Sequence, residues 1–114
     1  MRLLDWFRGG YATMDPAAVV GVWQLVRSEG LPHVAAELEM TEDGRMIYAI
    51  REGGKWQLMK LTYRLEGDTI VSNQPSAPRE ERTRFTIGVD GELILAWHGQ
   101  RSWFRRCEKR SPEV

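Results

Sequence analysis

Apolar and polar residues alternate with a period of two through most of the chain that follows Val19 and Val20. Successive side chains of a strand point to opposite faces, so this pattern predicts strands with one buried and one exposed face. The clearest runs place Val34, Ala36, Leu38 and Met40 on one face, and Met59, Leu61, Tyr63 and Leu65 on another. The pattern therefore predicts an all-β chain.

Short turn signals divide this pattern into eight segments. The signals are Leu31-Pro32, Thr41–Gly44, Gly53-Gly54, Glu66–Asp68, Asp90-Gly91 and Gly99-Gln100, with one longer loop over residues 74–79 that holds two prolines. Glycine and Asp-Gly pairs are typical of tight hairpins. Parallel strands need connections of about a dozen residues, and no gap is that long, so we expect antiparallel pairing in sequence order.

Closing such a sheet would remove its two exposed edges, and eight strands enclose room for side chains or one small ligand. We therefore predict an eight-stranded antiparallel up-and-down barrel whose first and last strands meet, with an open sandwich as the alternative. The predicted parts are an N-terminal tail and short helical segment (1–18), the barrel (19–109) and a polar tail (110–114). Asp15 is a good N-cap and Pro16 suits the first helical position.

Several motifs share their order and spacing with a known family. They are Gly21-x-Trp23, Thr41–Arg45, Tyr63–Ile70, Asp90–Leu95 and Trp103–Arg106. Together they resemble the bacterial lipocalin-like domains of the calycin group, over Val19 to about Cys107. The resemblance implies that Trp23 packs at the closed end of the barrel under an arginine, either Arg105 or Arg106. It also implies a cup that binds a small lipophilic molecule.

The alternation gives candidate residues for such a cup. Arg27 shares the parity of Trp23 and is predicted to lie at the opposite, open end, where it would contact an anionic head group. The predicted ligand-binding residues are Arg27, Leu38, Tyr48, Met59, Tyr63, Leu95 and Trp97. Equally, these large side chains could simply fill the core. A void of about 300 Å³ or more would favour a binding protein over a packed scaffold.

Composition and charge narrow the alternatives. Sixteen basic and sixteen acidic residues cancel, so no net field favours nucleic acid as a partner. One cysteine, Cys107, forms no internal disulfide, and no apolar run approaches the roughly 20 residues that span a bilayer, so a cytoplasmic protein is expected. His33, His98 and Cys107 show no metal-ligand spacing, so no metal or cofactor is predicted.

Three functions remain open at this point. The first is non-catalytic binding of a small apolar or amphipathic molecule in the barrel. The second is a protein–protein interaction module with a filled barrel, using the apolar N-terminal residues 1–10 or an outer strand surface, and a homodimer is compatible with either. The third is a barrel isomerase or cyclase that uses His98 or a tyrosine for acid–base chemistry. The sequence assigns no catalytic residue.

Overall fold

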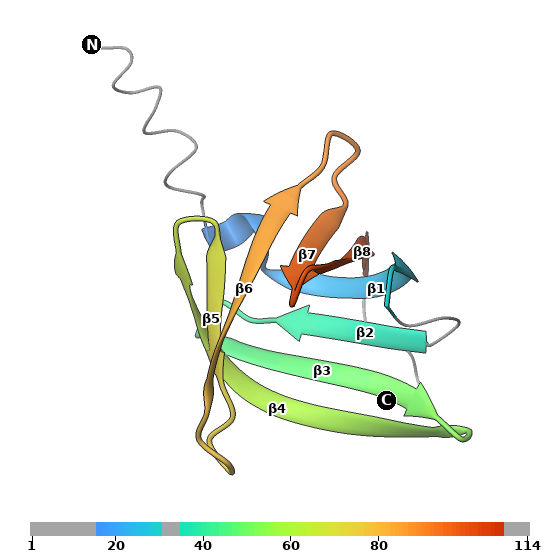
Figure 1. Cartoon of the computed structure of the whole chain (residues 1–114), viewed down its shortest axis with the longest axis vertical. Helices are drawn as coiled ribbons and strands as arrows, with labels where there is room; N and C mark the ends of the chain where they lie inside the picture. Colours follow the sequence, from blue (N-terminus) through green and yellow to red (C-terminus); the bar gives the residue numbers. More distant parts are fainter. Residues whose placement is uncertain (1–15, 31–34, 109–114) are drawn as a thin grey trace.

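The structure, a computed structural model, describes residues 16–30 and 35–108. A short 3₁₀ turn, η1 (Pro16–Ala18), precedes eight strands: β1 (Gly21–Ser28), β2 (Ala35–Met40), β3 (Arg45–Glu52), β4 (Lys55–Glu66), β5 (Thr69–Asn73), β6 (Glu80–Ile87), β7 (Leu93–Trp97) and β8 (Gln100–Cys107). Each strand pairs antiparallel with its neighbours in the sequence, and β8 pairs with β1 to close the barrel (Figure 1). The predicted all-β, eight-stranded antiparallel barrel is confirmed.

The predicted N-terminal helical segment is represented only by η1. No α-helix occurs in residues 16–30 and 35–108. These residues therefore contain no helix long and apolar enough to cross a membrane. Asp15, the apolar residues 1–10 and His33 lie outside the part that the structure describes.

Because neighbouring strands are antiparallel, successive connections between strands lie alternately at the two ends of the barrel. One end holds η1 and the connections 41–44, 67–68 and 88–92, and we call it the sealed end. The other holds the tight turns 53–54 and 98–99 and the loop 74–79, and we call it the open end (Figure 1). The two tight turns are two-residue hairpin loops with positive φ at both residues, which matches the twist of paired strands.

The buried core lies toward the sealed end. Its members are the least exposed apolar side chains of the inner face: Val19, Trp23, Leu38, Met40, Ile70, Phe85, Leu93 and Phe104. Apolar residues near the open end are much more accessible, with Met59 41% and Trp97 49% exposed. The interior is therefore packed at one end only.

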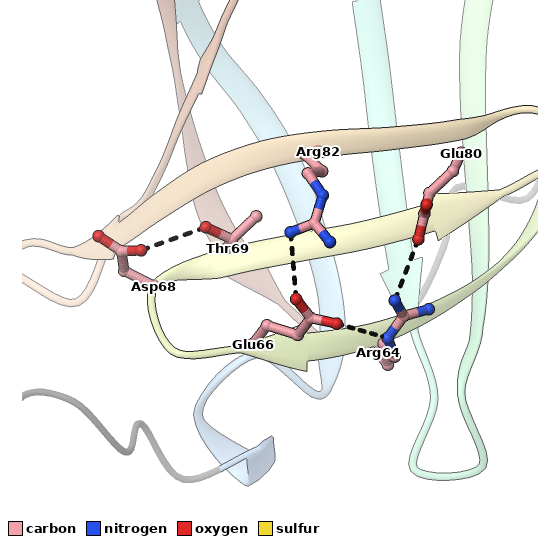
Figure 2. A network of polar contacts seen from close by, with 6 residues as sticks. All are labelled: Arg64, Glu66, Asp68, Thr69, Glu80 and Arg82. Atoms are coloured by element: carbon pink, nitrogen blue, oxygen red, sulfur yellow. Dashed lines mark hydrogen bonds and ion pairs between the residues drawn. The ribbon is translucent and has the colours of Figure 1, made fainter.

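The outer face of β4, β5 and β6 carries a network of ion pairs (Figure 2). Arg64 Nε and Arg82 Nη1 lie 2.8 and 3.1 Å from the Glu66 carboxylate, and Arg64 Nη2 lies 3.0 Å from Glu80. Val71 of β5 pairs with Arg64 and Arg82 and is only 2% exposed. Exposed ion pairs stabilise little individually, so the main effect of the network is to shield Val71 and link β4 to β6.

Candidate ligand-binding cavity

Trp23 seals one end of the barrel. Its side chain is fully buried, and its indole N–H donates to the Val19 carbonyl at 2.9 Å. The guanidinium carbon of Arg106 lies 4.3 Å from the centre of the Trp23 ring. A cation over an aromatic face is favourable by about 0.5–2 kcal/mol, depending on how well water is excluded.

Arg106 is the arginine that covers Trp23, while the neighbouring Arg105 is opposite Gln24 in the β1–β8 register. The Arg106 guanidinium donates to the carbonyls of Val20, at 2.6 Å, and Ala18, at 2.9 Å. A Cβ on Gly21 would lie 2.5 Å from Arg106 Nη1, and Gly21 has a φ of +139°. The positive φ favours glycine at this position of the Gly-x-Trp motif, and a side chain there would also displace the arginine head group.

Tyr63 also belongs to the sealed end. Its hydroxyl donates to the Thr41 carbonyl at 2.7 Å, and its backbone N–H donates to Gly44 at 2.8 Å. Burial, assisted by the negative charge of Asp43, raises the pKa of Tyr63. The phenol thus acts as a hydrogen-bond donor that holds the 41–44 hairpin against β4, and it does not line the cavity described next.

A cavity of about 710 Å³ lies inside the barrel and reaches toward the open end. Its apolar lining comes mainly from β3, β4, β7 and β8: Met46, Tyr48, Ile50, Met59, Leu61, Ala77, Leu95, Trp97 and Phe104. Its polar lining comes mainly from β5, β6, β8 and the 74–79 loop: Ser28, Ser72, Gln74, Arg79, Glu81, Thr83, Gln100 and Ser102. The volume falls within the range of about 300–1,000 Å³ that is usual for small-molecule sites.

Four of the seven residues predicted to bind a ligand line this cavity: Tyr48, Met59, Leu95 and Trp97. Leu38 is instead packed in the core with 2% exposure, and Tyr63 is engaged at the sealed end. Period-two alternation located the inner face correctly for these residues. It could not tell which inner-face residues border empty space, because that depends on how the side chains of all eight strands fill the interior.

The prediction that Arg27 faces the interior was wrong. Leu25 lies opposite Phe104 and Arg27 opposite Trp103, so Val26 is an extra, bulged residue in β1. The bulge reverses the parity beyond it, and Arg27 lies on the outer face with its guanidinium carbon 3.8 Å from the Trp103 ring centre. Arg101 lies over the same ring at 5.1 Å.

The charged residues of the cavity are Arg79 and Glu81, which the sequence prediction missed. Arg79 Nε lies 3.2 Å from Glu81 Oε2, and the Arg79 backbone N–H donates to Asn73 Oδ1 at 2.7 Å. Glu81 shares the parity of inward-facing Phe85, so extending that strand back to Glu80 would have identified it.

Tyr48 offers a polar group in the apolar part of the cavity. Within the described ranges, its hydroxyl has no hydrogen-bond partner. Burial raises the pKa of Tyr48, so the phenol is protonated at neutral pH and can donate to a ligand.

His98 and Cys107 lie apart from the cavity lining, whereas the tyrosine Tyr48 belongs to it. His98 is exposed in the 98–99 turn, and its ring stacks on Trp97 with 4.0 Å between centroids. Burial, with a contribution from Glu37, raises the pKa of the Cys107 thiol, which lowers the fraction of reactive thiolate. Among residues 16–30 and 35–108, no three His, Cys, Asp or Glu side chains are grouped to hold a metal ion.

No protein-family model matches the chain, and no curated protein matches it. The cavity and the motifs of the chain itself are therefore the features from which we infer its function.

Proposed function

We propose that this protein is a lipocalin-like, non-catalytic carrier that holds a small apolar or amphipathic molecule inside its barrel. The observation that carries the proposal is the cavity of about 710 Å³ beside a tightly packed end. A barrel that served only as a scaffold would gain stability by filling such a void, since lost packing contacts cost free energy.

The chemistry of the lining supports an amphipathic ligand. Methionines 46 and 59 are flexible and polarisable, and they adapt to ligands of different shape. The charged pair Arg79 and Glu81 and the hydrogen-bonded serines 28 and 102 give the ligand's polar group partners. The apolar part of a ligand would contact β3 and β4 while its polar group remains near the 74–79 loop.

The sealed end supports the lipocalin-like part of the proposal. The family resemblance implies an arginine from the last strand packed over the motif tryptophan. Arg106 lies over the buried Trp23 and beside Gly21 in this way. The proposal places the protein in the cytoplasm, and fractionation of cells that express it would test that location.

A matched pair of variants tests ligand binding. Met59→Trp would narrow the cavity, whereas Leu58→Trp adds the same ring to the adjacent outward-facing position, which is 48% exposed. Titration with the neutral fluorescent probe N-phenyl-1-naphthylamine should give saturable binding to the unmodified chain. We expect binding at least tenfold weaker in Met59→Trp and unchanged in Leu58→Trp.

Two results would contradict the proposal. The first is the absence of saturable binding by the unmodified chain for this probe and for a set of fatty alcohols, acids and amines. The second is equal weakening by both tryptophan variants, which would place the probe on the outer surface. Circular dichroism of each variant verifies that the barrel is folded.

A further inference from the structure

The two charged residues of the cavity differ in how they are held. Glu81 projects from strand β6, and its side chain is 31% exposed. Arg79 belongs to the preceding loop, and its side chain is 79% exposed. The adjacent Glu80 points outward to Arg64 in the ion-pair network, which fixes the start of β6 and hence the inward direction of Glu81 (Figure 2).

This difference makes the carboxylate the better site for a ligand charge. A cationic ligand group could take the place of Arg79 at Glu81, and the displaced arginine would remain hydrated. An anionic group that paired with Arg79 would instead leave the less exposed Glu81 without its counter-ion. Leaving the less accessible charge unpaired is the more costly of the two exchanges.

The aromatic residues of the cavity favour the same sign of charge. Tyr48, Trp97 and Phe104 line the cavity together with Glu81. The face of an aromatic ring carries negative potential, so it attracts cations and not anions. Trp97 lies on β7, the strand next to the β6 strand that carries Glu81.

We propose that the ligand is an amine: an apolar molecule with a protonated amino group that pairs with the Glu81 carboxylate, displacing Arg79. The inference depends on the proposed binding function and specifies its ligand class. The apolar part of the amine would occupy the region bounded by Met46, Met59 and Leu61.

Three ligands with the same chain and different head groups test the charge preference. Dodecylamine, dodecanol and dodecanoate, each below its critical micelle concentration, would displace N-phenyl-1-naphthylamine from the protein at pH 7 and low salt. We expect dodecylamine to bind about fivefold more tightly than dodecanol, and dodecanoate to bind most weakly. A fivefold gain in affinity is what one partly exposed ion pair typically contributes. Added salt should reduce these differences.

Adjacent substitutions identify the carboxylate. Glu81→Gln should remove the advantage of the amine over the alcohol, whereas Glu80→Gln, its outward neighbour, should preserve it. Arg79→Gln should leave amine binding equal or tighter, because the competing cation is gone.

The outcomes separate this inference from the function on which it depends. Tightest binding by dodecanoate, or an amine preference that survives Glu81→Gln, would overturn the amine assignment while supporting a lipid-binding barrel. Failure of all three ligands and of the probe to bind would overturn the proposed function itself.

Discussion

The two ends of the barrel each contain a tryptophan, and the two residues are held in contrasting ways. Trp23 at the sealed end is fully buried, with a partner for its N–H and an arginine over its ring. Trp97 at the open end is 49% exposed, stacks on His98 and borders the cavity. Packing at one end thus stabilises the fold, while the looser end borders a cavity.

Truncating the two tryptophans should give the largest difference between the ends. Trp23→Ala should lower the free energy of unfolding by about 3–5 kcal/mol, the usual cost of removing a large aromatic side chain from a core. Trp97→Ala should lower it by about 1 kcal/mol or less and mainly weaken probe binding. Urea denaturation followed by circular dichroism measures both, and equal losses would contradict the contrast between the ends.

The two adjacent arginines of β8 provide a second contrast, within the sealed end. Arg106→Ala removes two hydrogen bonds to backbone carbonyls and the contact with Trp23, so we expect a loss of about 1–3 kcal/mol. Arg105→Ala should change stability by about 0.5 kcal/mol or less, as is usual for exposed residues. Thermal denaturation of the two variants would show the difference, and similar melting temperatures would count against the closure by Arg106.

The two tyrosines allow the removal of a single hydroxyl at each region. Tyr63→Phe deletes the hydrogen bond to Thr41 and should cost about 1 kcal/mol of stability without changing probe affinity. Tyr48→Phe removes a hydroxyl with no partner in the described part of the chain, so stability should be nearly unchanged. Affinity for a ligand with a hydrogen-bond acceptor should fall in Tyr48→Phe alone, which parallel melting and binding curves would establish.

The smallest expected effect is the response of the outer ion-pair network to acid. Hydrogen bonds from Arg64 and Arg82 hold the pKa of Glu66 below its ordinary value of 4.5, and one from Arg84 lowers the pKa of Asp68 below 3.8. A lowered folded-state pKa stabilises the fold above the ordinary value, and the stabilisation is lost as pH falls through the lowered one.

The melting temperature should therefore fall below about pH 4.5, and the fall should be smaller in Glu66→Gln. Leu58→Ala, on the outer face of β4 but outside the network, is the control and should keep the full pH response. An identical acid profile for Glu66→Gln would mean that the network contributes nothing measurable.

Local patterns predicted the strands because each hairpin contains its own evidence: alternating residues in its strands and turn residues between them. The predicted turn at Glu66–Asp68 and the predicted loop over 74–79 enclose the observed strand β5 (Thr69–Asn73). The next strand, β6, ends at Ile87, before the predicted turn at Asp90-Gly91. Gly88 starts a turn in which its N–H donates to Glu92, and Val89 is fully exposed there.

The parity argument failed where the strand is irregular. A bulge at Val26 depends on how β1 pairs with β8, about 80 residues further along the chain, and no nearby residue signals it. The bulge turns Arg27 from the expected inner face to the outer face. A single extra residue therefore keeps this cation out of the cavity.

The sequence by itself determined the order of strands and their antiparallel pairing, because alternation and short turns are local properties. The closure at Trp23 was implied only by the family resemblance. Only the tertiary structure decided that Arg106 covers Trp23, that Arg27 faces outward and that a cavity of about 710 Å³ is lined in part by Trp97. Register and empty volume are set jointly by all eight strands, and no single segment encodes them.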